Sequence, residues 1–127
     1  MKRDFDYVRK ILLDIEGGQT EFETIDPDDE DEIDNPDRED KVKLAYHLNI
    51  MRQAGLIDVM TETFGGYELR GLTWEGHDFL DTIRDPEVWR KTKEGAGKVG
   101  GLTFGLIKDL GTAYLKHVAK ERLGLDL

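Results

Sequence analysis

The chain has 127 residues, of which 38% are hydrophobic, and it contains no cysteine. This length suits one domain, or one domain with an appendage, and the hydrophobic content excludes a wholly disordered protein. The lack of cysteine excludes disulfide-stapled folds and cysteine-ligated zinc. The N-terminal segment has no apolar core of the kind found in signal peptides, and no apolar run is long enough to span a membrane. We therefore expect a soluble protein of the reducing cytoplasm.

The net charge of −10 is concentrated in one segment of the chain. Residues 21–40 contain twelve acidic residues and one basic residue, Arg38, whereas the other residues contain sixteen acidic and seventeen basic ones. The sequence thus describes a nearly neutral protein that carries one acidic loop. Such a loop repels nucleic acid only from its own face, so nucleic-acid binding elsewhere on the protein is not excluded.

The first part of the chain predicts a helix, a short strand and a loop. Apolar residues at helical spacing predict a helix from Phe5 to Glu16, which Gly17 and Gly18 end. Alternating polar and apolar residues predict a strand at 21–25. The following segment, DPDDEDEIDN at about 26–35, has the composition of an exposed, mobile loop.

A second helix and a hairpin follow. Asn35 and Pro36 suit the N-cap and first position of a helix that ends at Gly55. Residues 57–64 and 67–72 predict a hairpin closed by Gly65-Gly66, a dipeptide that tolerates positive φ angles. Thr73 can cap a third helix. The apolar positions of that third helix are Trp74, Phe79, Leu80 and Ile83.

The last part of the chain predicts helices on both sides of a glycine-rich segment. Asp85-Pro86 ends the third helix, and Val88 and Trp89 begin a short one. GAGKVGG at 95–101 predicts a hinge, and a final helix spans 102–123. The fold class is therefore α+β and mainly helical. We predict a winged-helix-like domain over residues 1–85 and a C-terminal helical extension over residues 86–127.

Four segments of the chain together resemble one family. They are MKRDFDYVRKILLDIE, AYHLNIMRQAGLI, LTWEGHDFLDTIRDPEVWRKTKE and the glycine-rich turn before a C-terminal helix. In this order they are similar to the uncharacterised bacterial and phage family called domain of unknown function 2513. The resemblance implies a winged-helix-like fold and a bacterial or prophage setting, and it supplies no catalytic residues. The acidic loop departs from the family pattern, in which we expect a shorter and less charged segment.

One hypothesis is a DNA-binding regulator in which the second helix is the recognition helix and the hairpin is the wing. Asn and Gln can hydrogen-bond adenine, and cationic side chains contact phosphates. The hypothesis assigns nucleic-acid binding to Lys41, Lys43, Tyr46, Asn49, Arg52, Gln53 and Arg70. Alternatively, Tyr46 packs against the C-terminal helix, and the amide side chains are ordinary surface residues. The supply of cations is thin for a DNA-binding face.

A second hypothesis uses the acidic loop as a protein-interaction surface. The loop would bind a basic protein surface, or it would mimic the DNA backbone and occupy a DNA-binding partner, as in a phage-derived anti-defence module. Acidic charge in place of the usual positioning helix favours this hypothesis, whereas the hairpin favours the first. The residues assigned to this surface are Asp26, Asp28, Asp29, Glu30, Asp31 and Glu32.

Other motifs match functional patterns only in part. Residues 95–100 match GxGxxG but follow a polar helical segment rather than a strand, so we do not predict dinucleotide binding. His77 beside Asp78 has no evident nucleophile, and the alternating acids of the loop have Asp31 where a calcium loop needs glycine. We therefore expect no enzymatic activity, cofactor or metal.

The final helix combines an apolar stripe with lysines. Membrane-surface binding is disfavoured because glycines and acids interrupt the helix. We expect this helix to pack on the core or to form a homodimer with a second subunit. The expected partners are accordingly DNA or a host or phage protein, with no membrane.

Overall fold

The computed structural model describes residues 1–100, 103–124 and 126. The fold is mixed α+β and mainly helical, which confirms the predicted class. The chain separates into two compact units, residues 1–77 (unit 1) and 78–127 (unit 2). The elements are α1 (Phe5–Glu16), β1 (Glu21–Glu23), the 3-10 turn η1 (Glu30–Glu32), α2 (Arg38–Gln53), β2 (Ile57–Thr63), β3 (Gly66–Leu72), α3 (Trp74–Ile83), α4 (Pro86–Lys98) and α5 (Phe104–Leu123).

Helix α1 forms where the sequence predicts it. The Asp4 carboxylate caps its N-terminus by accepting a hydrogen bond from the Tyr7 amide at 3.1 Å. The chain leaves the helix through Gly18, whose φ of 111° favours glycine. The buried side of the helix consists of Phe5, Val8, Ile11, Leu12 and Ile15.

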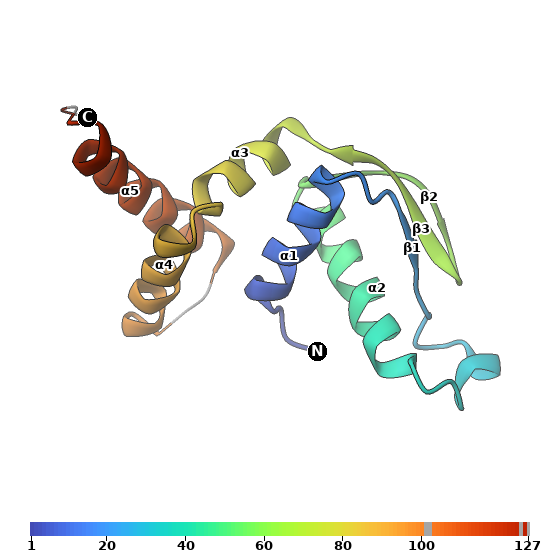
Figure 1. The fold of residues 1–127 in the computed structure, drawn as a ribbon. Helices are drawn as coiled ribbons and strands as arrows, with labels where there is room; N and C mark the ends of the chain where they lie inside the picture. The colour runs from blue at the N-terminus through green and yellow to red at the C-terminus, as the bar shows by residue number, and fades with distance from the viewer. Residues whose placement is uncertain (101–102, 125, 127) are drawn as a thin grey trace. The chain divides into compact units, whose positions relative to one another are not determined.

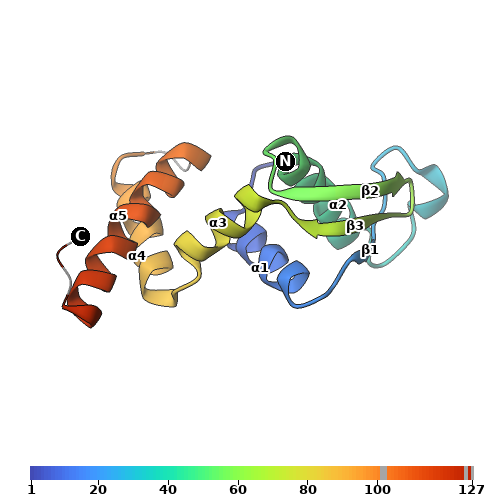
Figure 2. The same cartoon turned by 90° about the horizontal axis from the view of Figure 1, so that it is seen from above.

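Unit 1 is built on a three-stranded antiparallel sheet with the strand order β1-β3-β2. Helix α1 contacts β3, and α2 contacts both β2 and β3, with the two helices on one side of the sheet (Figures 1 and 2). Phe22, Tyr67 and Leu69 are the buried residues of β1 and β3. This order of helices and strands is consistent with the predicted winged-helix-like arrangement, and the acidic loop, which contains η1, lies between β1 and α2.

The hairpin turns one residue earlier than the sequence predicts. Thr63 pairs with Gly66, so Phe64 and Gly65 form the turn, and neither glycine has a positive φ. Gly66 is needed for a different reason: a Cβ atom there would lie 2.7 Å from the Phe22 carbonyl oxygen. The predicted positive-φ turn is therefore wrong, and the glycine serves the close approach of β1 to β3.

Helix α2 begins at Arg38 rather than at Pro36. The Asn35 side chain accepts a hydrogen bond from the Asp37 amide at 2.8 Å, which makes a turn before the helix instead of an N-cap. Asp37 occupies the N-cap position without a side-chain cap bond. The other end agrees with the prediction, because Gly55 leaves the helix with a φ of 76°.

Thr73 caps α3 as predicted, since its hydroxyl oxygen accepts a hydrogen bond from the Gly76 amide at 2.9 Å. The same hydroxyl donates to the Gly55 carbonyl oxygen. A Cβ atom at Gly76 would lie 2.0 Å from the Leu56 carbonyl oxygen, so only glycine fits at this position. The start of α3 is thereby fixed against the segment that joins α2 to β2.

One predicted apolar position of α3 is solvent-exposed. Phe79, Leu80 and Ile83 are buried, but the Trp74 side chain is 83% exposed. Five positions along an α-helix correspond to a rotation of about 140°, which turns Trp74 away from the side of Phe79. Trp74 is therefore an apolar position of α3 that lies in solvent rather than in the core.

Unit 2 contains α4, which is longer than the short helix predicted. The Asp85 carboxylate caps it by accepting hydrogen bonds from the Glu87 and Val88 amides, and Pro86 stands at its start. Residues 95–98, which the sequence assigns to a hinge, form the end of this helix. Positions 101 and 102, predicted to end the hinge and begin the last helix, lie outside the described residues.

Helix α5 packs against α4. Thr103 caps it by accepting a hydrogen bond from the Leu106 amide at 3.1 Å. A Cβ atom at Gly111 would lie 2.9 Å from the Thr82 side chain, so a small residue is required there. Arg122 on α5 lies 2.8 Å from the Asp85 carboxylate, and this hydrogen bond lowers the pKa of Asp85.

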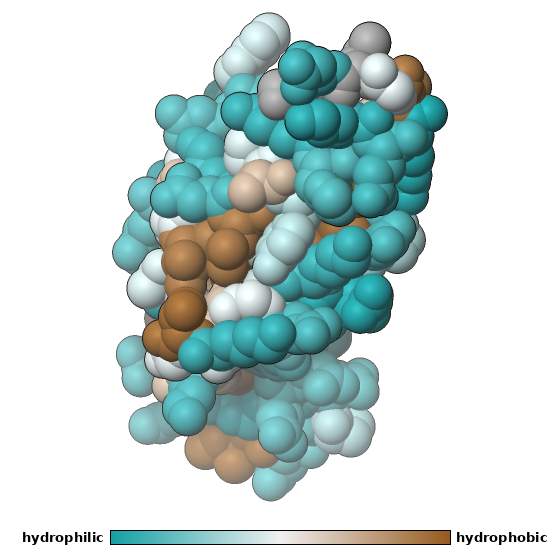
Figure 3. Space-filling view, turned by 90° about the vertical axis from the view of Figure 1, so that its left-hand side faces the viewer, coloured by the Kyte–Doolittle hydropathy of each residue, from teal (hydrophilic) through white to brown (hydrophobic). Residues whose placement is uncertain are grey.

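Most of the surface visible in Figure 3 is hydrophilic, and the apolar side chains gather in small separate groups. Within the described part of the chain, no helix has both the length and the apolar composition required to cross a membrane.

Candidate interaction surfaces

The first candidate is the α2–hairpin surface, which comprises the residues predicted to bind nucleic acid. Its two α2 lysines are each paired with a carboxylate. Lys41 Nζ lies 3.3 Å from Glu23 Oε2, and Lys43 Nζ lies 3.1 Å from Asp4 Oδ2. Lys43 Nζ also lies 4.5 Å from the centroid of the Tyr7 ring, a cation–π distance. These contacts join α2 to β1 and to the start of α1.

The two arginines of this surface are paired as well. Arg52 Nη1 lies 2.8 Å from Glu62 Oε2, and Arg70 Nη1 lies 3.3 Å from Asp58 Oδ1. The Tyr67 hydroxyl donates to Glu62 at 2.9 Å, and burial together with this hydrogen bond raises the pKa of Tyr67. The predicted phosphate contacts are therefore already engaged with acids of unit 1.

The remaining side chains of the α2–hairpin surface are polar or aromatic. Asn49 is half-buried, and Gln53 is exposed. The half-buried Tyr46 ring packs edge-on against His47, with ring centroids 5.3 Å apart. The surface thus offers two amide side chains and an aromatic ring beside cations that carboxylates already neutralise.

His47 is fully buried and connects α1 to α2, a role that the sequence analysis missed. Its Nε2 accepts a hydrogen bond from the Asp4 amide at 2.9 Å, and its Nδ1 donates to the Lys43 carbonyl oxygen at 2.8 Å. Its ring also meets the Tyr7 ring edge-on at 4.8 Å. Burial lowers the pKa of His47 and favours the neutral ring that these bonds require. The available signal was its position one helical turn before the buried Met51.

The second candidate is the acidic loop, residues 26–35. Side chains of the loop form hydrogen bonds that make local turns in its backbone. Asp26 Oδ1 accepts from the Asp28 amide at 2.8 Å, and Asp29 Oδ1 accepts from the Asp31 amide at 3.1 Å. The Asn35 side chain donates to Glu32 at 2.8 Å. These hydrogen bonds define the local conformation of the loop backbone, from which the carboxylates project.

Arg38, the single base of the acidic segment, binds the loop backbone. Its guanidinium donates to the Pro27 carbonyl oxygen at 2.8 Å and to the Asp29 carbonyl oxygen at 3.1 Å. It therefore fastens the loop to the start of α2 without forming a salt bridge with a loop carboxylate. This role of Arg38 was not predicted, although an isolated base within such an acidic run was itself a signal.

Several loop carboxylates remain available to a partner. Asp28, Glu30, Asp31 and Asp34 are exposed and form no ion pair within the described residues. Unit 1 contains twenty acidic and nine basic residues, whereas unit 2 contains eight acidic and nine basic ones. The excess negative charge therefore lies in unit 1, where like charges repel one another until a cation binds.

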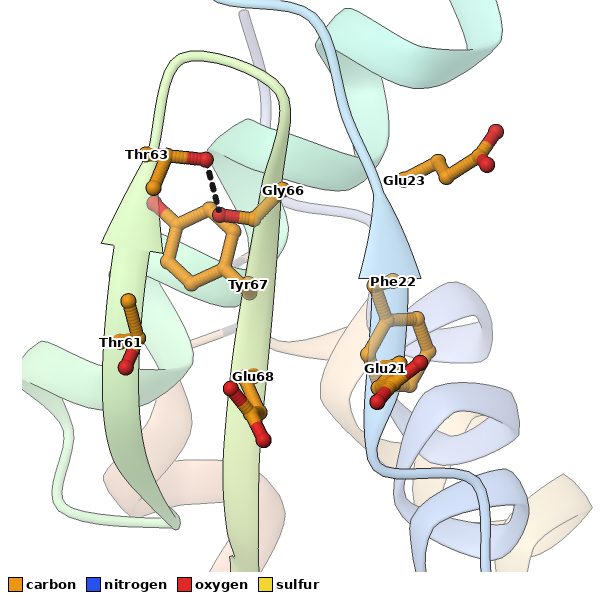
Figure 4. A pocket seen from close by; sticks show the side chains of 8 residues that line it. All are labelled: Glu21, Phe22, Glu23, Thr61, Thr63, Gly66, Tyr67 and Glu68. Carbon is orange, nitrogen blue, oxygen red and sulfur yellow. Dashed lines mark hydrogen bonds between the residues drawn. The ribbon is translucent and has the colours of Figure 1, made fainter.

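The outer face of the sheet also carries acidic side chains. Glu21 of β1 is directly opposite Glu68 of β3, and Thr61 of β2 pairs with Glu68 from the other side. Figure 4 shows these three side chains next to one another, with Glu23 further along β1. They line an open hollow of about 430 Å³. In the part of the chain that the structure describes, no cluster of three or more His, Asp or Glu residues could hold a metal ion.

The other sequence motifs are parts of helices. Residues 95–98 of the GxGxxG match lie within α4, so they do not form the strand-to-helix loop that dinucleotide binding requires. His77 is exposed, and its amide donates to the Thr73 carbonyl oxygen at 3.0 Å as part of the first turn of α3. Neither motif therefore competes with the two surfaces as a candidate site.

Comparison with known proteins finds a family-model match that spans both surfaces. A family model described as a hypothetical protein (DUF2513) matches residues 2–103. An uncharacterized protein of Haemophilus influenzae (strain Rd) is 33% identical over 96 residues, which cover 73% of this chain and 76% of that protein. No solved structure matches the chain. The match includes the acidic loop, the α2–hairpin surface and α4.

Proposed function

The chain belongs to the DUF2513 family, and we propose that it is a non-enzymatic binding protein whose acidic loop contacts a cationic protein partner. The observation that carries the proposal is the set of exposed carboxylates at Asp28, Glu30, Asp31 and Asp34, which form no ion pair within the described residues. A folded acidic loop on a unit with excess negative charge attracts a basic surface at long range and orients it on approach.

The fixed backbone of the loop supports the proposal. Arg38 donates to two loop carbonyl oxygens, and Asp and Asn side chains form local turns, so these contacts favour this arrangement of the loop before binding. A surface that is ordered in advance loses less conformational entropy on association. In a phage or prophage setting, such a surface would occupy the cationic site of a DNA-binding protein by presenting carboxylates where phosphates normally bind.

A second candidate function is DNA binding through the α2–hairpin surface. The position of α2 directly before the hairpin, with Asn49 and Gln53 on the helix, favours this candidate. The charge of unit 1 opposes it, because neutralising DNA phosphates requires cations that are not already paired. We therefore rank it below the acidic-loop function.

Binding measured across a salt series separates the two candidates. The probes are a random duplex-DNA pool and a synthetic peptide of alternating lysine and glycine. We expect salt-sensitive binding to the peptide and none to the DNA pool. Salt-sensitive enrichment of a DNA sequence that Asn49→Ala or Gln53→Ala relaxes would instead establish the DNA-binding function and reject the proposal.

A further inference from the structure

Two apolar side chains are exposed at the acidic end of unit 1. Ile33 follows η1 and is 59% exposed, and Phe64 in the hairpin turn is 63% exposed. The Thr24 amide donates to the Gly65 carbonyl oxygen at 3.1 Å, which ties the hairpin tip to the strand end from which the loop departs. The hairpin tip and the loop lie at the same end of unit 1 in both ribbon views (Figures 1 and 2).

A single exposed hydrophobic residue is ordinary in a folded protein. Two at one end of a unit, beside carboxylates without ion-pair partners in the described residues, have the composition of a binding surface. Protein interfaces place aromatic and aliphatic anchors in the centre and polar or charged groups at the rim. Ile33 is flanked in sequence by Glu32 and Asp34, which already provide such a rim.

The local structure holds both side chains in place. The Gly65 amide donates to the Thr63 hydroxyl at 3.3 Å, and Gly66 lies directly against the Phe22 carbonyl, so the turn that carries Phe64 is fixed. The Ile33 amide donates to the Glu30 carbonyl oxygen at 3.4 Å, within the turn that ends η1. Backbone ordering before binding leaves mainly side-chain freedom to be lost on contact.

We propose that Ile33 and Phe64 are the apolar anchors of the binding surface formed by the acidic loop and the hairpin tip, and that its partner is a protein segment carrying apolar side chains among its lysines and arginines. This inference rests on the proposed function, because the carboxylates supply the attraction for the cations. It adds that charge alone does not select the partner. The anchors favour a basic amphipathic segment over a purely cationic one.

The test uses two synthetic peptides of equal length and equal lysine content, one alternating with glycine and one with leucine. Dissociation constants are measured by fluorescence anisotropy for the full chain and for an Ile33→Ser/Phe64→Ser variant. The matched control is Val99→Ser, because Val99 is an exposed apolar residue of unit 2. Circular dichroism verifies that each variant is folded.

We expect the full chain and the control to bind the leucine peptide roughly tenfold more tightly than the glycine peptide, the range that one or two interface anchors supply. The double variant should bind both peptides equally while its salt dependence is unchanged. Equal binding of both peptides by the full chain, or an undiminished preference in the double variant, would overturn the anchor role alone. Binding of neither peptide would instead reject the proposed function.

Discussion

The α2–hairpin surface and the acidic loop both concentrate charged residues, but they use them in opposite ways. On the α2–hairpin surface, Lys43 and Arg52 reach carboxylates on other elements and join parts of unit 1. On the loop, Asp28 and Asp31 are exposed without ion pairs among the described residues, and Arg38 binds backbone carbonyls. The charge that remains after internal pairing, rather than the number of charged residues, therefore indicates the partner of a surface.

The largest expected effect concerns the scaffold that positions both surfaces. Gly76→Ala would place a Cβ atom 2.0 Å from the Leu56 carbonyl oxygen, and backbone cannot move aside as a flexible side chain can. We expect a loss of about 3 kcal/mol or more in the free energy of unfolding, measured by urea denaturation. Gly97→Ala in α4 is the control, because nothing lies within 4 Å of its added Cβ atom. Equal midpoints for the two variants would contradict this account of α3.

A pH series tests whether the neutral, buried His47 ring stabilises unit 1. Burial lowers the pKa of folded His47 below its ordinary value of 6.5, so the unfolded chain binds the proton first as the pH falls. The stability that neutral His47 contributes is complete above pH 6.5 and decreases as the pH drops below that value. The thermal unfolding midpoint should therefore decrease as the pH is lowered from 7 to 5. This decrease should be smaller in His47→Gln, and it should be unchanged in His77→Gln, which alters an exposed residue. If the midpoint of His47→Gln decreases as much as that of the intact chain, groups other than His47 cause the pH dependence.

Replacing Lys43 should have a smaller effect on stability, and it tests whether the cations of the α2–hairpin surface are engaged within unit 1. Lys43→Ala removes the ion pair with Asp4 and the cation–π contact with Tyr7, so we expect a loss of about 1 kcal/mol. In a chain of this size the melting midpoint should fall by about 4 °C. Lys108→Ala is the control, because Lys108 is exposed on α5, and it should leave the midpoint unchanged. A Lys43 variant of unaltered stability would mean that this lysine is available to a ligand.

The smallest expected effect has the opposite sign. Glu21 faces Glu68 across the strands, so Glu21→Gln relieves a like-charge contact and should raise the free energy of unfolding by about 0.5 kcal/mol. Glu23→Gln on the same strand removes the partner of Lys41 and should not be stabilising. Urea denaturation at low salt measures both changes, and the difference should shrink as salt is added. Stabilisation by both substitutions would show that Lys41 leaves Glu23 unneutralised.

Most of the fold could be predicted because local sequence determines it. The apolar spacing of α1, the Thr73 cap of α3 and the glycine that ends α2 each act within a few residues. The errors arise where a distant segment decides the conformation. Gly66 is required by the carbonyl of Phe22 on another strand, and the exposure of Trp74 depends on which side of α3 is covered.

The candidate site could be predicted only in part. The acidic loop was visible in the composition, but the pairing of Lys41 with Glu23 and of Arg52 with Glu62 depends on tertiary contacts that spacing does not reveal. The role of Arg38 was hidden for the same reason, since its acceptors are backbone carbonyls that every residue carries. Residue type identified the charged groups, and the three-dimensional structure identified which of them remain available.

The central claim is that the acidic loop binds a cationic partner. The most direct test neutralises two carboxylates in the loop and, for comparison, two in unit 2. The anisotropy of a labelled lysine–leucine peptide is measured with the intact chain, with Asp28→Asn/Asp31→Asn, and with Asp78→Asn/Asp109→Asn, which removes the same charge from exposed positions of unit 2. We expect the loop pair to weaken binding roughly tenfold at low salt, as for charged groups at an interface, and the unit 2 pair to have little effect. Equal weakening by both pairs would mean that net charge alone attracts the peptide, and it would contradict a binding role for the acidic loop.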